Sequence, residues 1–390
     1  MSNALSPPTL PALLARQATE RPHAIALRHK RLGIWVQWQW RQLADEALRV
    51  AESLRVRGFS RGTQLVLLTR PRTEALVLSL AAQALGGVVV PLDPEDTTAA
   101  IPSLLLHLQP AFLFAEGQLE VDQVLRACAP GHLIYADTRG LRSHPSPALQ
   151  TYSSLLASPP APLAALCCEG SLPAFHFYRL TAAGEIESHA LTHRELLAEA
   201  VTLLHRENIG AQDDALATRA FAAPGQARYL IAPWLQSGFT LNFPETPETR
   251  DRDRRDLEPT VVAGTGDTYD RITAMVMARL PAEGSRLRHL VDWSLSPSHK
   301  GLGRWMAHWL VRRPLRQVLG YARTRVLLLI GAQPSPATLD LLEALQLTLR
   351  HWPDAAEWRS VPEPAAKRQP VDWTPGALTG LDAVAATLTA

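Results

Sequence analysis

The sequence has few cysteines, no long apolar run and almost no excess of either charge. Its three cysteines, Cys128, Cys167 and Cys168, show no C-x-x-C spacing, and two of them are adjacent. This usage is not typical of a zinc site or a disulfide framework, and it predicts a reducing, cytoplasmic compartment. The strongest apolar stretch, residues 326–330, is far too short to cross a bilayer, so we expect no transmembrane segment.

Charge and composition narrow the class of protein further. The 390 residues include 39 basic and 37 acidic side chains, so the chain lacks the basic excess that a nucleic-acid-binding surface needs. Hydrophobic residues make up 46% of the chain and charged residues 19%, which is the balance of a globular protein rather than a disordered one. The beginning, MSNALSPPTLPALL, has no basic region followed by a long apolar run, so we expect no signal peptide.

Strand and helix patterns alternate along the chain. Apolar residues recur at period two in GIWVQWQW (33–40), and at helical spacing over residues 43–54, where Gly58 is placed to end the helix. The same patterns predict strands at 65–68, 88–92, 260–263 and 325–330, and helices at 73–85, 194–206, 269–279, 303–318 and 336–345. Continuous apolar strands separated by helices are typical of a parallel sheet covered on both faces, so the sequence predicts an α/β fold.

Five segments follow one another in an order that is itself informative. They are residues 33–68, GGVVVPLDP (86–94), ALTHRELLAEA (190–200), SGFTLNFPETPET (237–249) with DLEPTVVAG (256–264), and residues 310–349. In number, order and spacing these segments resemble the AMP-forming acyl-CoA synthetases, an adenylate-forming ligase family, of the long-chain fatty-acid type.

The resemblance covers residues 9–360 and implies a fold. It implies the large N-terminal core of that family, with two layered α/β subdomains that meet near residues 170–180 and a small distorted β-barrel. It also implies that the mobile C-terminal domain is missing and that residues 361–390 form a proline-rich tail.

The family binds ATP with a loop of the form Y-T-S-G-T-T-G-x-P-K-G, just before a T-H dipeptide. Counting back from the T-H of ALTHRELLAEA, the corresponding segment is YRLTAAGEIES, residues 178–188. Tyr178 and Gly184 match the family, whereas Thr181 replaces the first glycine and Glu187 replaces the lysine. Glycine N–H groups, hydroxyls and a lysine are the groups that bind phosphate oxygens, so these changes predict that triphosphate binding is lost.

Two further family motifs are changed in the same way. The Y-G-x-T-E motif, which implies contacts to adenine, phosphate and Mg²⁺, corresponds to residues 353–357, where only Glu357 matches. The L-P-L-A-x segment corresponds to RAFAA (219–223), which lacks the proline and the large gating residue. The resemblance therefore implies that Tyr178, Thr181, Gly184 and Glu357 are vestigial nucleotide-site positions. We expect no cofactor here: neither ATP and Mg²⁺, which the family uses, nor any other metal.

Other patterns indicate structure rather than chemistry. His189 and His193 are four residues apart but have no apparent third metal ligand, and GTGD (264–267) fits a turn from strand to helix. The run RDRDRRD (250–256) alternates in sign, which predicts a solvated helix face or loop. Residues 299–316 combine two tryptophans with several basic residues, and this helix could dock an acidic partner or a membrane surface.

These observations leave three hypotheses. The first is an acyl-CoA synthetase-like protein without adenylation activity, which still binds a fatty acid or acyl-CoA or has a regulatory role. The second is an active fatty-acid–CoA ligase completed in trans by a separate C-terminal domain. The third is a structural protein–protein interaction module that presents residues 299–316. Because the changes gather at the ATP-binding positions while the scaffold pattern is intact, we favour the first.

Overall fold

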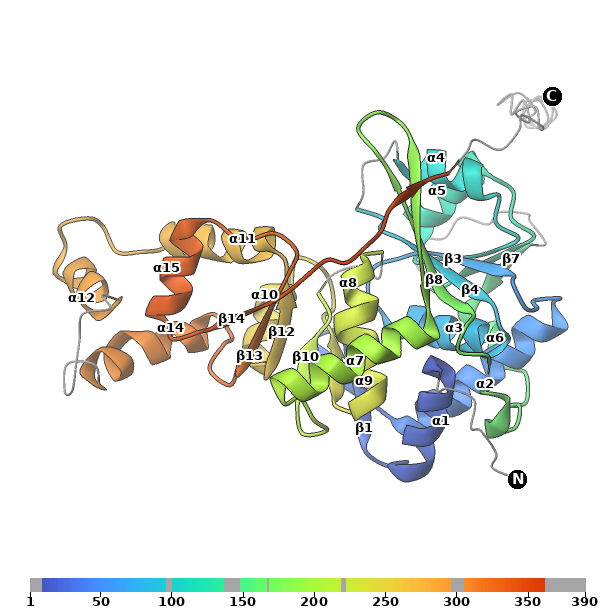
Figure 1. The fold of residues 1–390 in the computed structure, drawn as a ribbon, viewed down its shortest axis with the longest axis horizontal. Helices are drawn as coiled ribbons and strands as arrows, with labels where there is room; N and C mark the ends of the chain where they lie inside the picture. Colours follow the sequence, from blue (N-terminus) through green and yellow to red (C-terminus); the bar gives the residue numbers. More distant parts are fainter. Residues whose placement is uncertain are drawn as a thin grey trace, which may run out of the picture.

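Parallel strands with helices between them make up most of the fold (Figure 1). The computed structural model describes residues 9–95, 100–136, 148–166, 168–218, 222–295 and 305–361. Within these residues the strands form two mixed sheets, one of eight strands and one of seven, which confirms the predicted α/β fold. The same residues form no closed barrel, so the small distorted β-barrel implied by the resemblance is not found in this part of the chain.

The eight-stranded sheet is built mainly from the N-terminal half of the chain. Its strands, in spatial order, are β15 (Arg359–Ser360), β9 (Ile186–Thr192), β8 (Pro173–Leu180), β4 (Val88–Leu92), β3 (Gln64–Leu68), β5 (Phe112–Ala115), β6 (His132–Tyr135) and β7 (Leu149–Thr151). The strands from β8 to β7 run parallel to their neighbours, whereas β9 is antiparallel to both β8 and β15. The antiparallel edge therefore joins a hairpin to a strand that comes from the far end of the described chain.

The seven-stranded sheet joins the beginning of the chain to its second half. Its strands, in spatial order, are β14 (Leu349–Trp352), β13 (Val326–Ile330), β12 (Val261–Gly264), β10 (Asp214–Leu216), β11 (Thr240–Phe243), β1 (Ile25–Arg31) and β2 (Ile34–Gln39). All neighbours are parallel except β1 and β2, which form a hairpin.

Helices connect the strands and cover the sheets. In the first half they are α1 (Leu10–Glu20), α2 (Trp40–Val56), α3 (Thr73–Ala84), α4 (Ala100–Leu108), α5 (Gln118–Ala127), α6 (Tyr152–Leu155) and η1 (Leu163–Ala165). In the second half they are α7 (His193–Glu207), α8 (Pro224–Gln226), η2 (Ala227–Ile231), α9 (Ala232–Ser237), α10 (Arg250–Leu257), α11 (Gly266–Met277), α12 (Arg286–Leu295), η3 (His308–Arg312), α14 (Arg313–Val318) and α15 (Pro336–Ala344). None of these described helices is long and apolar enough to cross a bilayer.

Strand β3 shows why the strands are apolar without alternation. Leu65 and Leu67 belong to the core that contains α1, α2 and α3, whereas Val66 and Leu68 pack with α4 and α5 on the other face. Both faces of the strand are therefore covered. Because neither face contacts solvent, the strand is apolar throughout and does not alternate between apolar and polar residues.

Two helical segments contain wide turns of the π type, η2 and η3. Each is followed directly by a helix whose second residue is proline, Pro233 in α9 and Pro314 in α14. Proline has no N–H group to bond the carbonyl four residues back, and its ring crowds that carbonyl. The N–H of Ala232 instead bonds the carbonyl of Ala227, five residues back.

The predicted elements are present, with ends that differ by a few residues. The helix predicted at 303–318 is described from residue 305 onward and includes η3 and α14. The interpretation of 250–256 as a solvated helix face holds for Arg252, Arg255 and Asp256, which are exposed on α10. It was wrong for Asp253, which is completely buried and pairs with Lys30 at 2.7 Å. The subdomain boundary near 170–180 stays a prediction, and residues 362–390 of the expected tail lie outside the described residues.

Candidate functional site

The segment that corresponds to the phosphate loop is the tip of the β8–β9 hairpin. Tyr178 pairs with Ser188, and the turn lies between Thr181 and Glu185. The N–H of Gly184 bonds the carbonyl of Thr181 at 2.9 Å, and the N–H of Thr181 bonds the carbonyl of Glu185 at 2.8 Å. The N–H of Glu185 bonds the Thr181 hydroxyl at 3.1 Å. Three N–H groups of this loop are therefore satisfied inside the turn.

Glu187 lies in a strand and not in the turn. Its carboxylate accepts hydrogen bonds from Arg179 on the opposite strand, with Nη2 at 2.7 Å and Nε at 2.8 Å. The Arg179 guanidinium in turn lies 4.3 Å from the ring centroid of Trp358. Glu187, which was predicted to stand at the family's lysine position, is thus part of a cross-strand ion pair.

The residues that correspond to Y-G-x-T-E begin a segment that runs from one sheet to the other. This crossing segment, residues 353–361, leaves β14 of the seven-stranded sheet and pairs as β15 with β9 (Figure 1). Arg359 is opposite Ser188, and the N–H of Val361 bonds the carbonyl of Ile186 at 2.8 Å. The fold thereby places the two segments that carried the sequence prediction next to each other.

A buried arginine holds the crossing segment. Arg228 donates from Nη2 to the carbonyl of Ala355 at 3.3 Å and to Nε2 of His189 at 3.0 Å, and it forms an ion pair with Glu199. His189 donates from Nδ1 to the carbonyl of Glu357 at 3.1 Å. Burial, together with the charge of Arg228, lowers the pKa of His189, which fits a neutral ring that donates on one side and accepts on the other. The sequence interpretation missed Arg228, although an arginine inside the apolar run AAPGQARYLIAPWL was a visible signal.

The four predicted site residues do not share one environment. Thr181 and Gly184 lie in the hairpin turn, and Gly184 has φ of 82°, in the left-handed region that glycine adopts without strain. The hydroxyl of Tyr178 bonds His176 at 3.0 Å. The side chain of Glu357 is 80% exposed. Their role as vestigial nucleotide positions stays a prediction.

The paired histidines have structural partners. His189 is in β9 and His193 begins α7, so they do not share a helical face. Thr192 caps α7 in a capping box with Glu195, which explains the T-H-R-E sequence at that point. Across the residues that the structure describes, no three His, Cys, Asp or Glu side chains are placed to hold a metal ion.

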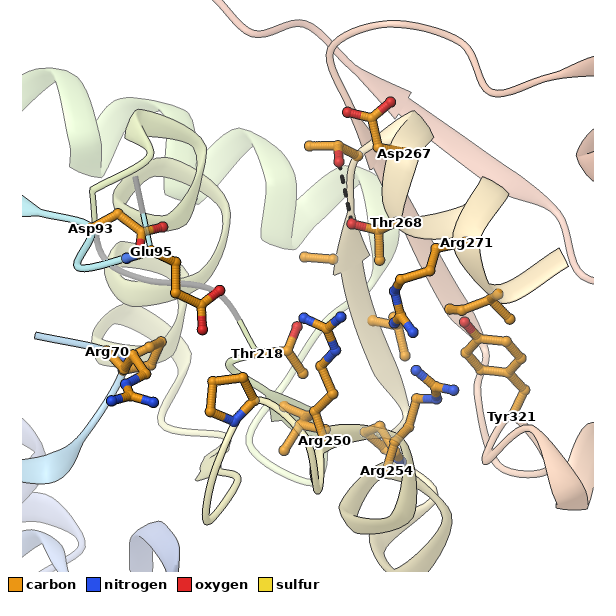
Figure 2. Close-up of a pocket in the computed structure, with 18 residues that line it drawn as sticks. Arg70, Asp93, Glu95, Thr218, Arg250, Arg254, Asp267, Thr268, Arg271 and Tyr321 are labelled. Carbon is orange, nitrogen blue, oxygen red and sulfur yellow. Dashed lines mark hydrogen bonds between the residues drawn. The ribbon is translucent and has the colours of Figure 1, made fainter. Parts of the chain in front are cut away.

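A cavity of about 250 Å³ lies between the two sheets (Figure 2). Its walls come from segments that directly follow parallel strands of both sheets, and from α10 and α11. They include Arg70 after β3, Asp93 and Glu95 after β4, Thr218 after β10, Thr265 after β12, and Arg250, Arg254 and Arg271 on the helices. The carboxyl ends of parallel strands are where α/β folds usually bind ligands.

Positive charge gathers on the α10–α11 wall of this cavity. Asp251 accepts from Arg271 at 2.9 Å and pairs with Arg254 at 3.0 Å. Arg250 points into the cavity beside them (Figure 2), and no described residue bonds or pairs with its guanidinium. Burial tends to raise the pKa of Asp251, but the three arginines outweigh burial and lower it. Two guanidinium groups therefore share the Asp251 carboxylate, and that of Arg250 lies beside them without such a partner among the described residues.

Negative charge lies mainly on the opposite wall. Asp93 and Glu95 come from the loop after β4, and Arg70 beside them is paired with Glu116 at 3.3 Å. Asp267, at the start of α11, is exposed and points away from the arginines (Figure 2). The wall formed by α10 and α11 is thus the part of the cavity suited to an anion.

Comparison with known proteins gives one sequence match and many fold matches. Residues 14–164 match the family described as AMP-binding enzyme. No curated protein sequence matches the chain. Among solved structures, VinN with 3-methylaspartate gives a TM-score of 0.61 at 13% identity, over 89% of this chain and 77% of that one.

Two CoA ligases give similar values. The anthranilate CoA ligase AuaEII in complex with anthranoyl-AMP has a TM-score of 0.64 at 14% identity, over 88% of this chain and 59% of that one. The benzoate CoA ligase from Burkholderia xenovorans LB400 has a TM-score of 0.62 at 19% identity, over 88% of this chain and 60% of that one. The family match thus covers residues 14–164, and the solved structures show that the chain shares their fold.

Proposed function

We propose that this acyl-CoA synthetase-like chain no longer adenylates and that it binds a small carboxylate in the cavity between the sheets. The observation that carries the first half is the internally bonded hairpin turn at the phosphate-loop position. Loops that bind phosphate present free N–H groups and a cation to it. Here the N–H groups of Thr181, Gly184 and Glu185 have partners within the turn.

The crossing segment supports the same proposal. Its main chain is bonded to Arg228 and His189, which are 4% and 8% exposed, and its Trp358 packs on Arg179. A nucleotide beside β9 would have to displace this segment, and the buried Arg228 and His189 would then lose their hydrogen bonds to the carbonyls of Ala355 and Glu357. Leaving a buried polar group without its partner costs about 1–3 kcal/mol.

The arginines support the second half. A guanidinium binds a carboxylate through two parallel hydrogen bonds, and Arg250 has none of these bonds with the described residues. The cavity is smaller than the roughly 300–1,000 Å³ of pockets for drug-sized ligands, which favours a small acid. The complexes of VinN with 3-methylaspartate and of AuaEII with anthranoyl-AMP show that proteins of this fold bind small acids or their adenylates. A fatty acid or acyl-CoA ligand stays a prediction.

ATP–pyrophosphate exchange tests the loss of adenylation. We expect the purified chain with Mg²⁺ and a panel of carboxylic acids to give no exchange above background, with a benzoate CoA ligase as the active control. Robust exchange by the chain alone would contradict the proposal. Exchange that appears only with an added C-terminal-domain protein would instead favour a ligase completed in trans.

Calorimetric titration with aspartate, benzoate and anthranilate tests carboxylate binding. We expect Arg250→Gln to weaken binding by about tenfold to a hundredfold, because a charge-assisted hydrogen bond contributes about 1.5–3 kcal/mol. Arg252→Gln is the matched control, since Arg252 is on the same helix, is exposed and does not line the cavity. No binding of any acid by the unchanged chain, or equal losses in both variants, would contradict the proposed site.

A further inference from the structure

We propose that the segment formed by α12, η3 and α14, together with residues 305–307, docks onto an anionic lipid surface. We call residues 286–295 and 305–318 the Trp/Arg lobe. Figure 1 shows this lobe at the end of the molecule farthest from the eight-stranded sheet. The proposal is independent of the proposed function of the cavity.

The helices of the Trp/Arg lobe bury little of their surface. Ser294 is the buried residue of α12, Arg312 is that of η3, and α14 has none. Arg312 donates from Nε to the carbonyl of Ser294 at 2.8 Å, and this contact ties the two helices together. Helices of this length are marginal in water unless an apolar face is covered. The lobe therefore presents a face that gains stability when a partner covers it.

Large apolar side chains are exposed both on α12 and around Trp305 and Trp309. Trp305 and Trp309 are 60% and 48% exposed, and their ring centroids lie 6.5 Å apart. On α12, Leu287, Leu290 and Trp293 recur at three-residue spacing and are 65%, 38% and 39% exposed. Tryptophan is the residue that gathers at the boundary between water and lipid, because its ring is apolar and its N–H can stay wet.

The charge of the lobe selects an anionic surface. The lobe, residues 286–295 and 305–318, contains five arginines and one acidic residue, whereas the whole chain has 39 basic and 37 acidic side chains. The rest of the molecule is therefore net acidic, and the basic excess is confined to the lobe. Arg313 lies over the Trp309 ring at 4.3 Å, so cation and apolar face are presented together. This combination is typical of helices that lie on anionic membranes.

The test is cosedimentation of the whole chain with vesicles of phosphatidylcholine, with and without phosphatidylserine. We expect binding only to the vesicles with phosphatidylserine, and a shift of tryptophan emission to shorter wavelength on binding. Binding should weaken when the salt rises from about 0.1 M to about 1 M, since the Debye length falls from about 10 Å to about 3 Å.

Two double variants test the contributions of the tryptophans and of the arginines separately. Trp305→Ala with Trp309→Ala should weaken vesicle binding at least about tenfold, because two apolar side chains that would be buried in the lipid are lost. Arg286→Gln with Arg313→Gln should weaken it about tenfold or more, because each cation near the lipid contributes about 1 kcal/mol. Leu32→Ala with Ile34→Ala is the matched apolar control, since these side chains are 76% and 68% exposed on the β1–β2 hairpin. Circular dichroism and thermal unfolding establish that each variant is folded.

Four results of the binding experiments would overturn the proposal. They are absence of binding to either kind of vesicle, equal binding to both kinds, equal losses in the lobe and control variants, and binding to poly-glutamate as tight as to the phosphatidylserine vesicles. The last result would assign the lobe to an acidic protein. A dimer in sedimentation velocity that dissociates on Trp305→Ala with Trp309→Ala would assign the face to a second copy and would overturn it as well.

Discussion

His193 shows how a residue of a recognisable motif acquires a purely structural role. Its Nδ1 accepts the N–H of Leu10 at 3.3 Å, and its Nε2 lies 3.4 Å from Sγ of Cys168. The ring is 1% exposed, and burial lowers its pKa to about 4. The histidine of the T-H dipeptide therefore holds the start of α1 against the hairpin and α7, and it does so as a neutral ring.

The first prediction concerns pH. The unfolded chain takes up a proton on His193 near the ordinary histidine pKa of 6.5, whereas the folded chain resists protonation until about pH 4. The stability contribution is complete above pH 6.5 and is lost as the pH falls toward 4, by about 3 kcal/mol in total. Urea unfolding at a series of pH values measures this, and His193→Asn should flatten the profile in that window. An unchanged slope in the variant would assign the pH dependence to other groups.

Arg228 is a charged residue that is buried in the fold. Its partners are Glu199 on α7, His189 on β9 and the carbonyl of Ala355, so it joins three segments: the consecutive β9 and α7, and the crossing segment, which is distant from them in the chain. An arginine in this position costs desolvation free energy, which its hydrogen bonds offset only when all three segments are in place.

The second prediction is that Arg228→Met lowers the free energy of unfolding by about 2–3 kcal/mol, because Glu199 and the Ala355 carbonyl lose their donor. Hydrogen exchange should also become faster over residues 353–361. The exposed Arg252→Met should change stability by less than about 0.5 kcal/mol. If Arg228→Met behaved like that control, Arg228 would not be what anchors the crossing segment.

At the scale of elements, the β8–β9 hairpin has a tight turn that contains one glycine. Gly184 has φ of 82°, and a Cβ added to it would meet no atom within 4 Å. Glycine is thus favoured at position 184 by its backbone conformation and not by lack of space. At Gly87 the reason is lack of space, because a Cβ there would lie 2.3 Å from the Phe59 ring. One glycine serves backbone conformation, and the other serves close packing between a strand and a loop.

The third prediction follows from this contrast. Gly184→Ala should cost about 1 kcal/mol through left-handed backbone strain, whereas Gly87→Ala should cost about 1–3 kcal/mol or more through overpacking. Thermal unfolding of the two variants gives the comparison. Equal and negligible effects would show that both sites relax freely, contrary to the packing seen around Phe59.

At the scale of the whole molecule, one continuous core joins the two sheets. Trp40 of α2 stacks on Trp234 of α9 with ring centroids 4.8 Å apart, and Trp234 donates to the carbonyl of Ala26 in β1 at 2.9 Å. The same core contains Leu65 of one sheet and Leu241 of the other. Strands of both sheets therefore depend on the same buried side chains.

The fourth prediction is that Trp234→Ala lowers the free energy of unfolding by about 3–5 kcal/mol, the usual cost of removing a buried aromatic side chain. Because the core is shared, far-ultraviolet dichroism and fluorescence should report one coincident transition in the unchanged chain. Two separate transitions would show that the halves fold independently. The exposed Trp309→Ala serves as the control and should leave stability nearly unchanged.

Local sequence pattern was enough to place most elements. The period-two run before α2, the apolar strands β3, β4 and β13 and the helix α15 all lie where hydrophobic spacing put them, since spacing depends only on near neighbours. The exception among the helices was α10, whose alternating charges suggested solvent. Lys30, more than two hundred residues earlier, is the partner that allows Asp253 to be buried.

The sequence by itself determined the α/β fold and predicted which positions correspond to ATP-binding motifs, because both are written in consecutive residues. Only the tertiary structure decided which contacts those positions make. It put the phosphate-loop segment into a closed hairpin turn, joined it to the crossing segment through Arg228, and grouped Arg250, Arg254 and Arg271 around Asp251. These contacts depend on which strand ends become neighbours in a sheet. Spacing along the chain does not predict that order, because strands that are neighbours in a sheet can be distant in the sequence.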